Sequence, residues 1–121
     1  MTTRRLKTYS AETGYVYQYY FVGKREALPG QPEAPASEYV FDVTLDGAVV
    51  FAFSVFLRAG ALTCWASAHG RALTEAEKYA AAKLRLLRDF DAMDSPALSV
   101  RRLQVTAENI ENLLADLRLD E

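Results

Sequence analysis

The sequence predicts an α+β domain of two layers, in which helices pack on one face of a mostly antiparallel sheet. The segment Ser37 to Leu57 contains two apolar runs separated by Asp46 and Gly47, a pattern typical of a β-hairpin. Later segments repeat apolar residues at helical spacing, and no regular alternation of strand and helix indicates βαβ units. The predicted order of elements is β-β-β-α-α-β-α.

The chain begins with a polar segment that contains basic residues and shows no periodicity. We expect residues 1–14 to form a flexible N-terminal arm and residues 15–121 to form a single domain, because a chain of this length suits one core. Tyr15 to Val22 is rich in β-branched and aromatic residues, which favours a strand. Residues 23–36 hold all but one of the prolines and are expected to form a long loop.

Two registers of the hairpin differ by one residue. A two-residue turn would mix aromatic and polar side chains on both faces, whereas a three-residue loop from Leu45 to Gly47 would separate them. A slip of one residue exchanges the faces of a whole strand, so we predict the register that separates them. The aromatic face then contains Tyr39, Phe41, Val43, Val49, Phe51 and Phe53. The other face contains Val40, Asp42, Thr44, Ala48, Val50 and Ala52.

Two helices are expected after the hairpin. The first covers residues 61–68 and ends at Gly70, since glycine readily adopts the left-handed conformation of a helix end. Thr74 and Glu77 have the spacing of a capping box, which predicts the start of a longer helix that runs to about Met93.

One more strand and one more helix complete the prediction. Residues 98–105 favour a strand, and a slip in their alternation at Arg101 and Arg102 indicates a bulge or bend. Thr106 then begins the last helix. The apolar stripe of this helix contains Ile110, Leu113, Leu114 and Leu117.

Composition narrows the classes of protein that the chain can represent. Its net charge of -2 gives no overall attraction to nucleic acid or to anionic membranes. The longest apolar run, Ala48 to Phe53, is too short to span a bilayer, and the first residues lack the apolar segment of a signal peptide. The single cysteine, Cys64, cannot form an internal disulfide and fits a reducing compartment. We therefore expect a cytoplasmic protein.

Lys83 is the position where residue type conflicts with helical pattern, because it falls within the apolar arc of the long helix. A buried amine of lowered pKa would suit a Schiff-base or general-base lysine, or an anchor for an anion. The favoured alternative is a stem that lies along apolar surface with its amine in water, paired with a carboxylate such as Asp42. Burying an isolated ion costs several kcal/mol, which supports this alternative.

Cys64 and His69 invite comparison with a thiol–imidazole pair, but their spacing does not support one. They are five residues apart, about 140° around a helix, so their side chains do not meet. A single histidine without ligand spacing predicts no metal site. We expect neither a metal nor a cofactor.

The aromatic residues suggest the function. Seven Tyr and six Phe lie mostly in the first three predicted strands. We expect one aromatic face to form the core and the other to mediate self-association, because Tyr tolerates partial burial and is common at interfaces. The predicted protein is a homodimeric interaction or structural domain without enzymatic activity.

Two alternatives stay open. A small-molecule-binding or enzymatic domain would use a pocket between sheet and helices, lined by Tyr17, Tyr19, Phe41 and Lys83. A single-stranded nucleic-acid binder would stack bases on exposed aromatic rings beside basic side chains, although the negative net charge argues against it.

Overall fold

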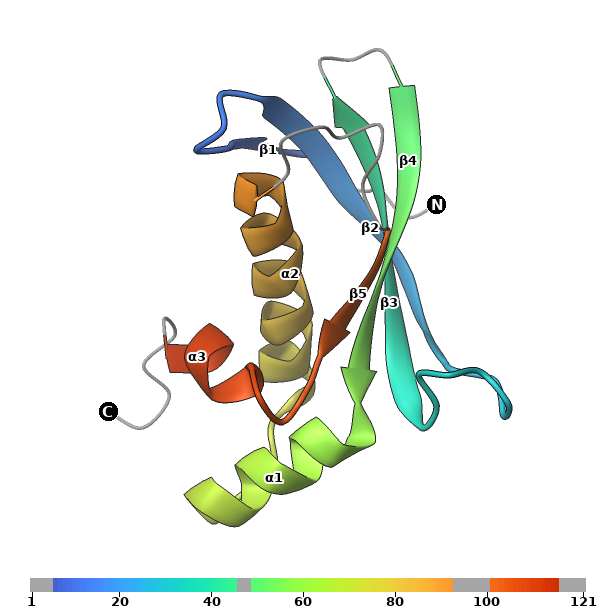
Figure 1. Cartoon of the computed structure of the whole chain (residues 1–121), viewed down its shortest axis with the longest axis vertical. Helices are drawn as coiled ribbons and strands as arrows, with labels where there is room; N and C mark the ends of the chain where they lie inside the picture. Colours follow the sequence, from blue (N-terminus) through green and yellow to red (C-terminus); the bar gives the residue numbers. More distant parts are fainter. Residues whose placement is uncertain (1–5, 46–48, 93–100, 116–121) are drawn as a thin grey trace.

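The computed structural model describes residues 6–45, 49–92 and 101–115. In this part of the chain a five-stranded sheet carries helices on one side (Figure 1). The strands are β1 (Lys7–Ser10), β2 (Val16–Glu26), β3 (Ala36–Leu45), β4 (Val49–Arg58) and β5 (Arg102–Val105). The helices are α1 (Ala59–His69), α2 (Glu75–Ala92) and α3 (Ile110–Ala115). The predicted α+β class with a mostly antiparallel sheet is confirmed.

The strands lie side by side in chain order, and each pair of neighbours is antiparallel except β4 and β5. The parallel pair forms because the chain leaves β4, passes through α1 and α2, and returns to the edge of the sheet as β5. A parallel pair needs such a crossover, since a tight turn can join only antiparallel strands.

The predicted order lacked one strand, because β1 lies within the segment that we expected to be a flexible arm. Lys7 pairs with Tyr19 and Ser10 with Val16, so β1 is an edge strand of the sheet. The observed order is β-β-β-β-α-α-β-α. The residues of β1, KTYS, include one aromatic and no aliphatic side chain, so their composition does not indicate a strand.

The hairpin of β3 and β4 separates its faces as predicted, although its register differs. Phe41 lies opposite Phe53, and Leu45 pairs with Val49. The three residues between the paired strands are therefore 46–48, one position later than expected, and they lie outside the described residues. Because the pairing shifts by an even number of residues, the side chains that the structure describes keep their predicted faces. The shift also allows Leu45 to pack against the core.

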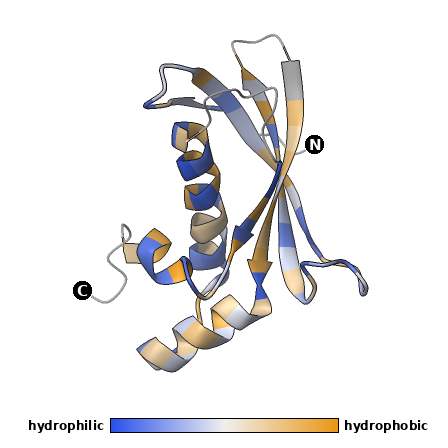
Figure 2. Ribbon diagram, viewed as in Figure 1, coloured by the Kyte–Doolittle hydropathy of each residue, from blue (hydrophilic) through white to orange (hydrophobic). Residues whose placement is uncertain are grey.

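The core lies between the sheet and α2. Phe90 of α2 stacks on the ring of Tyr17, with 4.2 Å between centroids and 5° between planes, and it meets Phe53 edge-on at 6.1 Å. Leu86 lies one turn earlier on α2 and is fully buried. In Figure 2 hydrophobic residues alternate with hydrophilic ones along α2, as expected of a helix that buries one face.

Two of the predicted helix signals, at Gly70 and at Thr74, are confirmed. Gly70 follows α1 with φ 72°, and its N–H donates to the carbonyl of Ala66. Before α2, the backbone N–H of Thr74 donates to Glu77 Oε1 at 2.8 Å, while the N–H of Glu77 donates to Thr74 Oγ1 at 3.2 Å. These reciprocal bonds define a capping box.

Several predicted features fall outside the described residues. They are the end of the long helix near Met93, residues 98–100 of the strand predicted at residues 98–105, and Leu117 of the terminal stripe. The other members of that stripe, Ile110, Leu113 and Leu114, are buried as predicted.

The opposite face of the sheet, called the open face here, is not covered by any described helix. Its central part consists of alternate residues of three strands: Val16, Gln18, Tyr20, Val22, Val40, Asp42, Thr44, Ala52 and Ser54. A bulge in β2 between Phe21 and Gly23 changes the alternation. Beyond it Lys24 reaches Glu75 of α2, whereas Arg25 reaches Glu38 on the open face.

Candidate functional site

The structure separates the predicted ligand-pocket residues into two environments. Tyr17, Tyr19 and Phe41 are buried in the core, where Tyr19 lies 6.4 Å from Phe41 in an edge-on arrangement. Lys83 is only partly buried. The three aromatic rings therefore pack the domain, and Lys83 is the predicted residue that also reaches the surface.

Lys83 does not pair with Asp42, the carboxylate suggested by the sequence. Asp42 lies on the open face and accepts a hydrogen bond from the Tyr20 hydroxyl at 2.8 Å. The sheet separates it from α2. Burial, followed by the contact and charge of Lys7, lowers the pKa of Lys83 below its ordinary value. Its neighbour is thus another cation.

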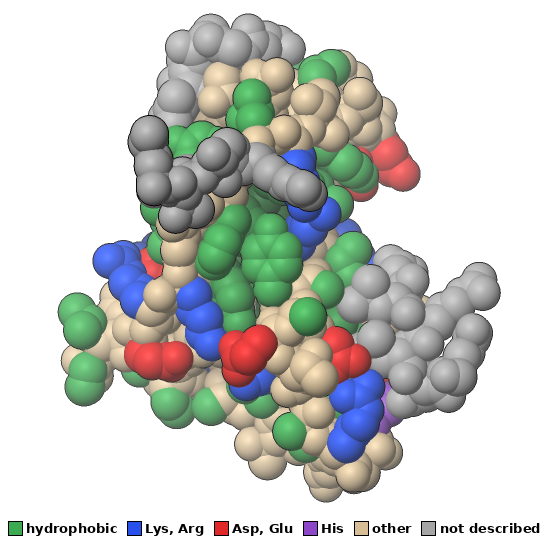
Figure 3. All heavy atoms as spheres, turned by 180° about the vertical axis from the view of Figure 1, so that it is seen from behind, with side chains coloured by type: hydrophobic (Ala, Val, Ile, Leu, Met, Phe, Trp, Pro, Cys, Tyr) green, Lys and Arg blue, Asp and Glu red, His purple; other side chains and the backbone are tan. Residues whose placement is uncertain are grey.

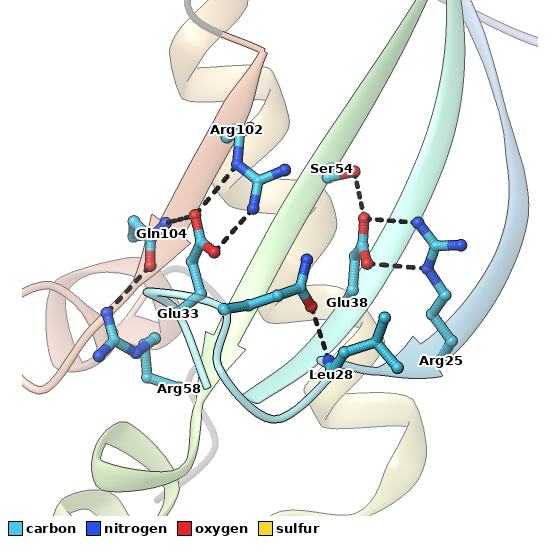
Figure 4. A network of polar contacts seen from close by, with 9 residues as sticks. Arg25, Leu28, Glu33, Glu38, Ser54, Arg58, Arg102 and Gln104 are labelled. Atoms are coloured by element: carbon cyan, nitrogen blue, oxygen red, sulfur yellow. Dashed lines mark hydrogen bonds and ion pairs between the residues drawn. The ribbon is translucent and has the colours of Figure 1, made fainter. Parts of the chain in front are cut away.

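A buried carboxylate, Glu38, lies at the lower end of the open face (Figure 4). Only 3% of Glu38 is exposed, and it accepts hydrogen bonds from Arg25 Nε at 2.8 Å and from the hydroxyl of Ser54 at 2.6 Å. The hydrogen bond from Arg25 is the main cause that lowers the pKa of Glu38, against the opposing effect of burial. This carboxylate therefore stays ionised near neutral pH.

A second carboxylate, Glu33, comes from the loop between β2 and β3 and is 7% exposed. Arg102 of β5 donates two hydrogen bonds to it, at 3.1 Å and 2.7 Å, and thereby lowers its pKa. The guanidinium of Arg102 also lies 4.7 Å above the ring of Phe56, which is fully buried. The loop is thus fastened across the open face to the edge strand β5 (Figure 4).

This network is suited to holding structure together rather than to proton transfer. A general base works best with a pKa near the working pH, whereas the pKa of both carboxylates is lowered. Ser54 donates its hydroxyl hydrogen to an ionised Glu38 that Arg25 already neutralises. No local pattern in the sequence predicts this network, because its members come from four strands and a loop.

His69 and Cys64 have separate environments on α1. The His69 ring stacks on Trp65, with 4.1 Å between centroids and 15° between planes, and its Nε2 lies 2.7 Å from Glu111 Oε1 of α3. Cys64 is exposed. Across the described ranges, no three His, Cys, Asp or Glu side chains are arranged to hold a metal ion.

A groove of about 260 Å³ follows the bulge of β2. It is lined by Val22, Gly23, Lys24, Arg25 and Val40. The view from behind shows hydrophobic side chains gathered in the middle of the molecule between basic and acidic groups (Figure 3). Apolar surface therefore reaches solvent in more than one place.

Comparison of the chain with protein-family models, with curated proteins and with solved structures gives no match. None of the described helices is both long and apolar enough to cross a membrane. The fold and site define an α+β domain with one helix-covered face and one open face.

Proposed function

We propose that the protein is a non-enzymatic interaction domain that pairs with a second copy of itself through the open face. The observation that carries this proposal is the apolar surface left on that face. Val16 and Val22 are 39% and 36% exposed, and Ala52 is exposed between them and the far edge of the sheet. β-Branched and small side chains form a flat surface suited to packing on another sheet.

The proposed surface is less aromatic than the sequence suggested. Among the described residues of this side of the sheet, the aromatic side chains are Tyr20 and Phe56, and Phe56 is covered by Arg102. The remaining aromatic rings of the strands point toward the helices and form the core. The interface would therefore consist mainly of aliphatic side chains, with one tyrosine, Tyr20, from each copy.

The balance of charge on the open face favours a second copy as the partner. In a two-fold dimer the same patch meets itself, so a surface of one charge would repel its partner. Arg25 neutralises Glu38, whereas Asp42 accepts a hydrogen bond from the uncharged hydroxyl of Tyr20. Asp42 is the one charged residue in the central part of the face, so repulsion between two copies is limited to this pair of carboxylates.

The area of the face sets the expected strength of the dimer. Three strands about 4.8 Å apart and six residues long, at about 3.3 Å per residue, cover roughly 300 Å² of flat area. Stable dimers bury about 800 Å² of accessible surface per partner, and smaller contacts are typical of weak or transient pairs. We therefore expect a monomer–dimer equilibrium that depends on protein concentration in the micromolar range or above.

Analytical ultracentrifugation across a wide range of concentrations tests this proposal. Ala52→Glu should keep the protein monomeric, because each copy would add a second carboxylate directly opposite Asp42 in the sheet. Ala68→Glu makes the same change at an exposed site on α1 and should dimerise like the wild type. A wild-type chain that stays monomeric at near-millimolar concentration, or equal dimerisation of the two variants, would refute the open face as the interface.

The cytoplasm is the compartment that we propose. Cys64 is exposed and forms no disulfide, and an exposed thiol persists where the environment is reducing. Fractionation of cells that express the chain, with an antibody against it, would test this location.

A further inference from the structure

We propose that Lys7 and Lys83 form a binding site for a doubly charged oxyanion, such as a phosphate group, where β1 meets α2. The site lies on the helix-covered side of the sheet, so it is separate from the open face and independent of self-association.

The pairing of β1 directs Lys7 toward α2. Lys7 lies opposite Tyr19, whose side chain is buried on the helix-covered face. Along β1, Lys7 and Tyr9 are partly buried, whereas the residues after each of them are exposed, as alternation requires. Tyr9 reaches Asp91 near the end of α2, so Lys7 lies beside an earlier turn of the same helix.

Lys83 comes to the same junction from the helix. It precedes Phe90 by seven residues, two turns, and so shares the side of α2 that faces the sheet. Phe90 is fully buried there against Tyr17. Burial and the contact with Lys7 both disfavour the charged form of Lys83.

Among the described residues, no ion pair joins Lys7 or Lys83 to a carboxylate. Lys24 and Lys78, in contrast, both pair with Glu75 at 3.1 Å. Repulsion between two cations grows as water is removed from around them. An anion bound between the two amines would be attracted by both and would offset their repulsion. An anion that carries two charges would balance the charges of two amines.

Two tyrosine residues occupy neighbouring positions in the sheet and the helix. Tyr19 adjoins Lys7 in the sheet, and Tyr79 lies one turn before Lys83 on α2. Burial, and then nearby Tyr79, raises the pKa of Tyr19, so its phenol keeps its proton near neutral pH. A protonated hydroxyl can donate a hydrogen bond to an oxyanion without competing for charge.

Thermal unfolding of the full chain in sodium phosphate, against sodium chloride of equal ionic strength, provides the first test. Chloride controls for screening of the repulsion between the amines. Phosphate should raise the melting temperature above its value in chloride by more in the wild type than in Lys83→Met, because binding stabilises only the protein with the site, whereas exclusion of phosphate from the surface stabilises both. An identical melting temperature in the two salts would overturn the proposal.

Calorimetric titration with phosphate then locates the site. Lys83→Met should weaken phosphate binding by about tenfold or more, since a hydrogen bond to a charged group is lost. Lys78→Met removes a lysine from the same helix that already pairs with Glu75, and it should bind phosphate as the wild type does. Equal affinity of Lys83→Met and wild type would place the anion elsewhere and refute the site.

NMR of the lysine side chains gives a readout that does not depend on the stability of the variants. Phosphate should shift the side-chain signals of Lys7 and Lys83 together, with the same concentration dependence, and leave those of Lys78 in place. Movement of Lys78 alone, or of all lysines equally, would contradict a site formed by Lys7 and Lys83.

Discussion

The hydroxyl of Tyr9 donates a hydrogen bond to Asp91 Oδ2 at 2.7 Å and joins β1 to the last turn of α2 across 82 positions of sequence. Asp91 also accepts the backbone N–H of Glu12 at 3.0 Å, so one carboxylate holds both the strand and the turn that follows it. A strand of four residues has little stability of its own. This carboxylate is therefore a main anchor of the edge strand.

We predict that Tyr9→Phe destabilises the fold by about 0.5–1.5 kcal/mol, the usual net contribution of a hydrogen bond. Amide hydrogen exchange should become faster in β1 and stay unchanged in β3 and β4. In a double-mutant cycle, Asp91→Asn should lose most of its effect when Tyr9 is already Phe. Independent effects of the two substitutions would show that the bond contributes nothing measurable.

The same bond predicts a dependence on high pH. The hydrogen bond to Asp91, and then burial, raises the pKa of Tyr9 from 10.0 to about 12, with a contribution from Glu12. Because the folded-state value is raised, the stabilisation is fully present below pH 10 and is lost as pH rises through about 12. Spectroscopic titration of the tyrosines should show one group that titrates near 12 in the wild type and disappears in Tyr9→Phe.

We predict that Glu38→Gln costs about 1–3 kcal/mol, because it removes a buried charge that Arg25 and Ser54 both contact. Glu26→Gln is the matched control, since Glu26 is exposed on the neighbouring strand, and its effect should stay within about 0.5 kcal/mol. Denaturant unfolding measures both. Similar effects of the two variants would mean that burial of Glu38 makes no difference.

Acid unfolding should distinguish the same two variants. The pKa of Glu38 is lowered in the folded protein, so its stabilisation is present above the unfolded value of about 4.3 and is lost as pH falls below it. The stability of Glu38→Gln should therefore decrease less between neutral and acidic pH than that of the wild type. A parallel decrease in both proteins would contradict the assignment.

We predict that Thr74→Ala destabilises the protein by about 1 kcal/mol, because an amide of the first turn of α2 loses its acceptor. The control is Thr63→Ala on α1, where the hydroxyl donates to the carbonyl of Ala59 within the helix. That bond adds little to a helix, so Thr63→Ala should change stability by less than about 0.5 kcal/mol. Thermal unfolding of the two variants measures the difference.

The largest loss of stability is expected from Phe90→Ala, about 3–5 kcal/mol, since Phe90 is fully buried and contacts rings from several strands. Phe51→Ala serves as a control. Phe51 lies on the helix-covered face of the sheet, but it is only partly buried, under the guanidinium of Arg101. Its cost should be clearly smaller. Equal costs would indicate that the core is not centred on α2.

Local patterns in the sequence determined the elements whose geometry depends on nearby residues. The alternation around Phe41 and Phe53 placed the aromatic side chains on one face, because neighbouring residues of a strand point in opposite directions. Thr74 and Glu77 marked the start of α2, and Gly70 the end of α1, through hydrogen bonds that span only a few residues. These features could be predicted because the interactions that form them are local.

Only the tertiary structure decided which distant groups meet. The crossover through α1 and α2 places β5 beside β4, and this brings Arg102 to Glu33, 69 residues earlier in the chain. The tertiary structure also places β1 against α2, where Lys7 meets Lys83 and Tyr9 meets Asp91. No local pattern encodes these contacts, because they follow from how the core closes around Phe90 and the buried face of the sheet.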